Sequence, residues 1–312
     1  MEATSFFSFD DTKLNAYELN SAKEKKAVVQ IIHGMGEHAG RYENLANFLV
    51  SQGFVVFMSD HRAHGKTAET LSEIGVYEND IFYDTVRDQI YISEYLLQKY
   101  QLPLIVIGHS FGSFILQRYH ELYHKQSAII LIGSGFLKND INTYLGELLA
   151  IIGAKIKGKK APAKLIHNLT FKKYNAKFAD KNWLTSSKEE QQKQRTDRYC
   201  NRIFSYNFYK HFFKGIRHIY LGKQVSKIKL KTPILILSGE LDALNKEGNG
   251  IQKLQEFYKN NGVNKVALKI YKTARHEVLN ETLKEDVYND ILQFITDIVP
   301  VQENKVKEKI KK

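Results

Sequence analysis

Apolar residues along this chain gather in short runs, separated by longer stretches of mixed apolar and polar residues. The runs are rich in Val, Ile and Leu, as buried strands are, and lie at residues 28–32, 104–107, 128–133, 232–238 and 266–271. Residues 42–52 and 83–100 show the mixed pattern of helices. Because this alternation predicts parallel strands joined by crossover helices, we expect an α/β fold with a mostly parallel sheet flanked by helices.

The run at residues 104–107 leads into a serine framed by glycines, Gly108-His109-Ser110-Phe111-Gly112, and the helix-prone residues 114–119 follow. A Gly-x-Ser-x-Gly sequence between a strand and a helix predicts a nucleophile elbow, a sharp turn that lifts the serine hydroxyl above the sheet. We expect Gly108 and Gly112 to be required, because a Cβ atom there would collide where the strand and helix backbones nearly touch. Ser110 is therefore the candidate nucleophile.

Two residues at the ends of later predicted strands complete a candidate catalytic triad. A serine hydroxyl needs a histidine base, and the histidine needs a carboxylate that holds its tautomer. Asp242 and His276 follow the runs at 232–238 and 266–271, at the strand ends where parallel sheets place catalytic groups. His276 is the only histidine after Asp242. Glu240 competes for the role of the acid, and we favour Asp242 because it lies further along the turn.

The glycine-rich loop at residues 33–42 follows the run at 28–32. An oxyanion hole is usually built from the amide after the nucleophile and an amide of an early strand-to-helix loop. These would be the backbone N–H groups of Phe111 and Met35. A plain turn is the alternative interpretation of the loop.

Together these motifs resemble the monoglyceride lipase and lysophospholipase branch of the α/β-hydrolases, which carries a serine aminopeptidase S33-type hydrolase domain. The motifs lie at residues 33–42, 60–65, 108–112, 238–242 and 275–281, within a similar stretch of about residues 25–295. The resemblance implies an α/β-hydrolase fold with an inserted helical cap. It also implies Ser110, Asp242 and His276 as the triad and the amides of Met35 and Phe111 as the oxyanion hole.

The motif at residues 60–65 differs from the family pattern at Ala63, where a glycine is usual, and Ala243 stands where a proline commonly follows the acid. Neither position takes part in the chemistry. Asp60, His61 and His64 do not have the spacing of a hydrolytic zinc site, and no cysteine or acidic cluster joins them. We expect these three residues to be structural, and we expect no metal and no cofactor.

Positive charge is concentrated between the runs at 128–133 and 232–238. Residues 136–222 hold 18 Lys and Arg against 6 Asp and Glu, an excess equal to the net charge of +12 of the whole chain. An insertion at this place in an α/β-hydrolase is usually a cap over the active site. Its apolar residues 144–154 precede a lysine-rich stretch, a combination that suits an anionic membrane surface or an amphiphilic lipid. A solvated cap is the equal alternative, and nucleic acid is not an expected partner.

The remaining features concern domains and location. With 312 residues and 43% apolar residues, one α/β-hydrolase domain is expected at 1–299, with the cap at about 136–222 and a basic flexible tail at 300–312. A single cysteine, Cys200, fits a reducing compartment. No signal peptide and no apolar run of about 18 residues is present, so we expect a cytoplasmic protein, with peripheral membrane contact left open.

The predicted function is hydrolysis of carboxylic esters through an acyl-enzyme on Ser110. The expected substrates are small amphiphilic esters with one acyl chain, either monoacylglycerols or lysophospholipids. A short-chain carboxylesterase, an acyltransferase or a peptidase would use the same triad. A non-catalytic binding protein on a hydrolase scaffold is the alternative from another class, and the intact triad argues against it.

Overall fold

The computed structural model describes residues 1–20, 24–138, 140–245 and 249–299, and these contain one sheet of eight strands. The strands are β1 (Thr4–Phe7), β2 (Lys13–Leu19), β3 (Val28–Ile32), β4 (Val55–Ser59), β5 (Leu104–His109), β6 (Ala128–Ile132), β7 (Ile234–Gly239) and β8 (Val266–Tyr271). Their order across the sheet is β1-β2-β4-β3-β5-β6-β7-β8. Antiparallel pairing joins β1 to β2 and β2 to β4, whereas the pairs from β4–β3 to β7–β8 are parallel. The predicted mostly parallel sheet is therefore confirmed.

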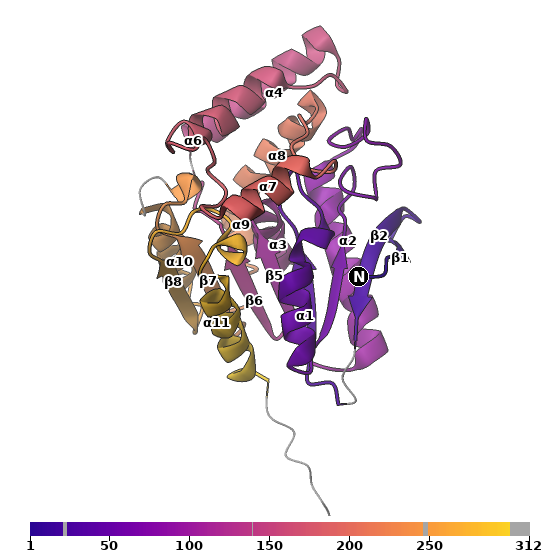
Figure 1. The fold of residues 1–312 in the computed structure, drawn as a ribbon, viewed down its shortest axis with the longest axis vertical. Helices are drawn as coiled ribbons and strands as arrows, with labels where there is room; N and C mark the ends of the chain where they lie inside the picture. The colour runs from indigo at the N-terminus through magenta and orange to yellow at the C-terminus, as the bar shows by residue number, and fades with distance from the viewer. Residues whose placement is uncertain (21–23, 139, 246–248, 300–312) are drawn as a thin grey trace, which may run out of the picture.

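Helices cover both faces of this sheet, as Figure 1 shows. Helices α1 (Glu43–Ser51) and α11 (Lys284–Thr296) pack on one face, and α2 (Ile81–Tyr100), α3 (Phe111–Leu122) and α10 (Asn249–Asn260) on the other. Along β5, Leu104 and Val106 join the apolar core of the α2–α3 face, and Ile105 and Ile107 join that of the α1–α11 face. Since successive side chains of a strand point to opposite faces, a sheet covered on both sides requires such uninterrupted apolar runs.

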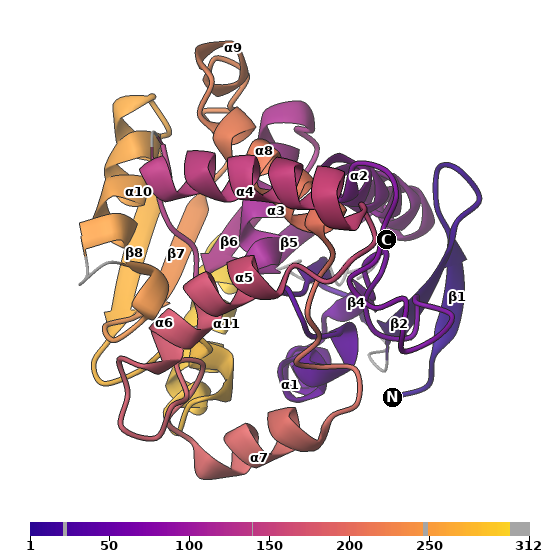
Figure 2. The same ribbon diagram turned by 90° about the horizontal axis from the view of Figure 1, so that it is seen from above.

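Between β6 and β7 the chain leaves the sheet and forms the segment that we call the insertion, residues 136–222. Its helices are α4 (Ile141–Lys157), α5 (Lys164–His167), α6 (Lys173–Asn175), α7 (Lys188–Thr196) and α8 (Tyr206–Ile219), with α9 (Gly222–Val225) at its end. A π-helical turn, Asn168–Lys172, joins α5 to α6. These helices lie at one end of the sheet (Figure 1), and seen from above α4, α5 and α6 cross over it (Figure 2).

Helix α4 packs closely on α8 because small residues of α4 receive aromatic rings. A Cβ atom at Gly146 would lie 2.5 Å from the ring of Phe213, and one at Gly153 would lie 2.1 Å from the ring of Tyr206. Glycine at both positions therefore allows the two helices to approach each other, at a cost in helix propensity of about 1 kcal/mol for each glycine.

Another side of α4 is apolar and exposed to solvent. Ile141, Leu145, Leu148, Ile152 and Ile156 recur there at helical spacing, with Tyr144 exposed beside them. Ile156 is 75% exposed. None of the helices in the described ranges combines the length and the hydropathy needed to cross a bilayer. The predicted basic tail at residues 300–312 lies outside the described residues.

Candidate active site

Ser110 occupies the sharp turn between β5 and α3 that the sequence predicts. Its backbone angles are φ 52° and ψ −117°, a conformation rare for a residue with a side chain, and its amide donates to Ile132 O at 2.9 Å. A Cβ atom at Gly108 would lie 2.5 Å from Gly112 O in the following helix. At Gly112 it would lie 2.1 Å from Ile32 O, so this glycine makes room for the end of the neighbouring strand β3.

The structure brings Ser110, His276 and Asp242 together from the ends of three strands. His276 Nε2 lies 2.9 Å from Ser110 Oγ, and His276 Nδ1 lies 2.8 Å from Asp242 Oδ2. The side chains of His276 and Asp242 are 1% and 0% exposed. Burial lowers the pKa of His276, but the charge of Asp242 and its hydrogen bond outweigh burial and leave that pKa above its ordinary value. Glu240, the rival acid, instead accepts the amide of Thr273 at 3.3 Å.

The two residues predicted to form an oxyanion hole lie beside this triad. Met35 lies in the turn after β3, and Phe111 is the first residue of α3. Both residues, like Ser110 and His276, line the same cavity. The first amides of an α-helix have no acceptor within the helix, so the amide of Phe111 is suited to bind an oxygen from outside it.

A buried charge network that the sequence analysis did not find lies next to the triad. Arg41 Nη1 donates to Glu37 Oε2 at 2.8 Å, and the guanidinium binds Glu277 with two hydrogen bonds of 2.8 and 2.7 Å. Burial raises the pKa of both carboxyl groups, but neighbouring groups outweigh it and leave both pKa values below the ordinary one. For Glu37 these groups are chiefly His109 and Arg41, and for Glu277 the group is chiefly Arg41. Because Glu277 follows His276 in the chain, the network joins the loop after β3 to the loop that carries His276.

His109, which precedes Ser110, is also held by this network. Its Nδ1 lies 2.8 Å from Tyr42 Oη and 3.2 Å from Glu37 Oε1, and Tyr42 Oη donates to Glu37 Oε1 at 2.7 Å. With the phenol proton given to Glu37, Nδ1 is the protonated nitrogen of the His109 ring. Its Nε2 is buried and has no protein partner in the described structure.

A cavity of about 480 Å³ opens at Ser110 and His276. Most of its wall is apolar and comes from the insertion. The apolar residues of this wall include Leu145, Leu149, Ile166, Leu169, Phe171, Phe212, Phe213 and Ile216. The wall also has charged and polar residues. Glu37 and Arg41 come from the loop after β3, and Lys173, Lys177 and Gln194 come from the insertion.

The histidines of the motif at residues 60–65 lie behind the site and connect two loops. The amide of His61 donates to His33 Nε2 at 2.9 Å, and His61 Nε2 lies 2.9 Å from His33 O. Burial lowers the pKa of His61 to about 3 and that of His64 to about 4, so both rings are neutral near pH 7. Asp60 accepts the amides of Ala39 and Lys66, both at 2.8 Å. These contacts are structural.

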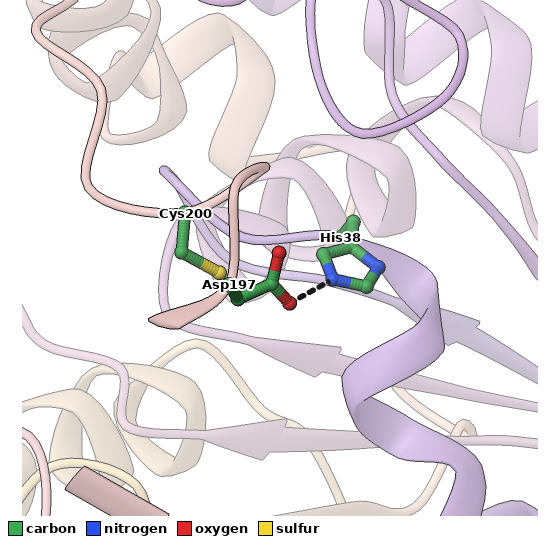
Figure 3. A group of neighbouring side chains, drawn as sticks. All are labelled: His38, Asp197 and Cys200. Atoms are coloured by element: carbon green, nitrogen blue, oxygen red, sulfur yellow. Dashed lines mark hydrogen bonds and ion pairs between the residues drawn. The ribbon is translucent and has the colours of Figure 1, made fainter. Parts of the chain in front are cut away.

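One group of ligand-type side chains lies elsewhere, where the insertion meets the loop after β3. Potential ligand atoms of His38, Asp197 and Cys200 lie within 4.8 Å of one another. Figure 3 shows these three side chains. His38 Nδ1 accepts the amide of Gly40 at 3.2 Å, so its proton is on Nε2, which donates to Asp197 at 2.7 Å. Both ring nitrogens are thus engaged, and a metal ion would have to break one of these hydrogen bonds.

Comparisons with known proteins agree with this geometry. The family model described as Serine aminopeptidase, S33 matches residues 23–283. The monoacylglycerol lipase of Mycolicibacterium smegmatis is 26% identical over 278 residues, which cover 87% of this chain and 89% of that protein. The monoglyceride lipase of Homo sapiens is 28% identical over 279 residues, which cover 87% and 82%. A solved carboxyl esterase from Bacillus coagulans, in complex with glycerol, has a TM-score of 0.86 at 24% identity and covers 96% of this chain and 99% of that chain.

The sheet topology, the elbow and the arrangement of the three side chains define an α/β-hydrolase. Within this class, the chain belongs to the family described as Serine aminopeptidase, S33. Its similarity to the two monoglyceride lipases confirms the resemblance inferred from the motifs.

Proposed function

We propose that this protein is a serine carboxylic-ester hydrolase that acts on lipids with one acyl chain, monoacylglycerols or lysophospholipids. The observation that carries the proposal is that His276 bridges Asp242 and Ser110 at the inner end of an apolar cavity. The relatives named as monoacylglycerol and monoglyceride lipases support the same substrate class.

In the first half of the reaction, Ser110 Oγ attacks the ester carbonyl carbon while His276 Nε2 takes the hydroxyl proton. The carbonyl oxygen becomes an oxyanion, which the amides of Met35 and Phe111 would bind. Asp242 keeps the Nδ1 proton directed toward itself and stabilises the imidazolium. When the tetrahedral intermediate collapses, His276 gives its proton to the leaving alcohol, and the acyl group remains on Ser110.

In the second half, His276 removes a proton from a water molecule, and the resulting hydroxide attacks the acyl carbon. Collapse of this intermediate breaks the bond to Ser110 Oγ, which takes the proton back from His276. The products are a carboxylic acid and an alcohol, and the enzyme is restored.

The cavity supports the proposed preference for a single acyl chain. Its volume of about 480 Å³ lies within the usual range of ligand pockets, roughly 300–1,000 Å³. Aromatic and aliphatic side chains of α4 and α8, such as Leu149, Phe212 and Ile216, would pack against the acyl chain of the substrate. We propose that the insertion acts as a cap, which covers the site and lines the cavity that would hold the acyl chain.

A peptidase is less well supported by the charged groups of the cavity. An aminopeptidase needs a carboxylate to bind the substrate amine. Of the carboxylates that line the cavity, Glu37 and Glu277 each already accept hydrogen bonds from Arg41. They are therefore poorly suited to hold a second cation.

We also propose that the outer face of the insertion docks on an anionic membrane. The exposed apolar residues of α4 lie next to exposed lysines at 155, 157, 159, 160 and 164. Leu165 and Leu169 extend the apolar surface beside α4 and are 54% and 56% exposed. Apolar area and lysines on one surface match a negatively charged bilayer, where each lysine contributes about 1 kcal/mol.

Labelling and hydrolysis together test the ester hydrolase. A fluorophosphonate probe should label the unchanged protein and fail to label Ser110→Ala. Hydrolysis of monoacylglycerols, lysophospholipids and p-nitrophenyl esters of increasing length should then favour long single-chain substrates. Failure of the probe to label the unchanged protein would overturn the serine mechanism. A preference for acetyl esters would indicate a short-chain esterase instead of a lipase.

A further inference from the structure

One part of the insertion is bound to the loop that carries His276. Leu184 O accepts the amide of Glu277 at 2.7 Å, and the amide of Ser186 donates to Glu281 at 3.0 Å. Arg275 Nη1 donates to Asp180 Oδ1 at 2.9 Å. Residues 180–186, which we call the tether, are therefore fixed to both sides of His276.

The tether places the indole of Trp183 over the imidazole of His276. The two ring centroids are 4.4 Å apart and the rings are inclined by 30°. Trp183 is 8% exposed, and the ring of Tyr174 packs on it at 5.0 Å between centroids. Trp183 and His276 both line the cavity.

We propose that Trp183 is a positioning residue for His276 in the reaction of Ser110. The inference rests on the proposed ester hydrolysis, because it concerns the base of that reaction. His276 must hold Nδ1 on Asp242 and Nε2 on Ser110 at the same time, and both contacts depend on the orientation of one ring. A flat indole held by the tether restricts rotation of the imidazole out of that orientation.

The stacked indole also favours the charged form of His276 that appears during the reaction. The imidazole becomes a cation when it takes the serine proton. A cation over the face of a tryptophan within about 6 Å is attracted by the ring, and more strongly where water is excluded. Trp183 is thus placed to stabilise the transition state rather than the bound ester, and its loss should lower kcat more than it raises KM.

Three variants and a short ester test the proposal in the full chain. With p-nitrophenyl acetate, Trp183→Leu should lower kcat by about tenfold or more, while Trp183→Phe, which keeps an aromatic face, should restore most of the loss. Phe178→Leu is the matched control. Phe178 stacks on Arg275 at 4.3 Å in the same region but has no ring contact with His276 among the described residues. This control should keep the kcat of the unchanged protein, and thermal unfolding of each variant checks that it is folded.

Tryptophan fluorescence gives a second readout that does not need activity, because Trp183 is the only tryptophan of the chain. A protonated imidazole quenches a stacked indole, so emission should fall in one step as His276 gains a proton. The charges of Asp242, Glu277 and Glu37 raise the pKa of His276 and so the midpoint of this step, and the ring of His109 lies 5.1 Å from that of His276. Burial raises the pKa of Tyr174, the titratable ring on the other side of Trp183, to about 12, so it does not titrate in the same range.

The fluorescence step should disappear in His276→Asn and remain in Ser110→Ala. The proposal would be overturned if Trp183→Leu lost kcat and Trp183→Phe did not restore it. It would also be overturned if Trp183→Leu and Phe178→Leu lost kcat equally, because Trp183 would then act only through packing. Unchanged kcat in Trp183→Leu would overturn it as well. These results differ from failure of the proposed function, in which the unchanged protein itself would neither hydrolyse the ester nor react with a fluorophosphonate.

Discussion

Arg41 and Glu277 are 236 positions apart in the chain and form a buried, two-hydrogen-bond ion pair. Their side chains are 9% and 3% exposed. The pair joins the loop proposed to supply an oxyanion donor to the loop that carries His276, the proposed base. Such a pair fixes the distance between two parts of the site that no secondary structure connects directly.

Removing the charge of Arg41 should therefore destabilise the protein. Arg41→Met leaves the carboxylates of Glu37 and Glu277 buried without their cation, and breaking a buried pair in this way costs about 3–5 kcal/mol. Urea unfolding measures the change. Lys125→Met is the control, because Lys125 pairs with Glu94 at 2.8 Å on the surface, and exposed pairs contribute at most about 1 kcal/mol. Equal effects of the two substitutions would show that the Arg41 network does not stabilise the fold.

The proposed triad predicts strongly non-additive effects. Ser110→Ala and His276→Ala should each remove nearly all esterase activity, and the double variant should lose little more, because the two residues act as a unit. The fold should persist, since neither substitution changes the backbone turn. Initial rates with p-nitrophenyl butyrate give the comparison. Near-normal turnover by Ser110→Ala would rule out Ser110 as the nucleophile.

The pKa of His276 predicts the acid limb of the activity profile. The base must be neutral to accept the serine proton, so kcat/KM should fall as the pH drops through a pKa that Asp242 holds above the ordinary value of 6.5. Asp242→Asn removes the largest influence that raises this pKa, whereas burial, which lowers it, remains. Histidine NMR titration of the variant should therefore show a lower pKa for His276 than in the unchanged protein. An unchanged pKa would mean that Asp242 does not set the charge state of the base.

The crowding at Gly112 predicts that even the smallest side chain is not tolerated. A methyl group in Gly112→Ala would meet Ile32 O at 2.1 Å, so the variant should lose more than about 4 kcal/mol or fail to accumulate as soluble protein. Gly222→Ala is the matched control, because a Cβ atom at Gly222 has no atom within 4 Å. A stable and active Gly112→Ala protein would contradict the geometry of the elbow.

The outer surface of the insertion predicts membrane binding that depends on salt. Binding to vesicles with phosphatidylserine should weaken as salt rises, because screening limits the reach of the lysines to about 8 Å at physiological ionic strength. Replacing the lysines at 155, 157, 159 and 160 by Gln should reduce binding further, and so should serine at Leu148, Ile152 and Ile156. Hydrolysis of a small soluble ester should not change. Absence of co-sedimentation at low salt would leave this surface solvated and overturn the docking proposal.

The apolar runs predicted the central strands well, because β3, β5, β6 and β7 are buried along their whole length and leave nearly continuous apolar runs in the sequence. The edge strand β8 is only partly buried, but its run, broken by Lys269, was apolar enough to predict it. The antiparallel strands β1 and β2 were not predicted. β2 lies near the edge of the sheet, and its buried Leu14 and Ala16 alternate with polar residues over only a few positions. The run at β4 was overlooked, although Val55 to Met58 are as apolar as the others.

The arrangement of the three candidate triad residues could be predicted because each follows a strand of a parallel sheet, and topology alone brings such ends together. Arg41, Glu277 and Trp183 carry no comparable signal. Their contacts depend on how long loops fold against one another, and an arginine or a tryptophan in a loop has no periodic pattern. The motif at residues 275–281 did include Glu277, but its sequence does not indicate a partner in the loop after β3.

The tether sets a limit on how this chain can be recombined with others. A chimera that replaced residues 136–222 as one block would remove Trp183 together with the partners of Arg275, Glu277 and Glu281. It would lose the contacts that hold the loop of His276, along with the surface proposed to dock on lipid. A graft confined to α4 would exchange the outer apolar face and part of the cavity wall and leave the tether in place. If the proposed roles of the tether and of α4 hold, substrate range and support of the proposed base are encoded in different stretches of the insertion and can be exchanged separately.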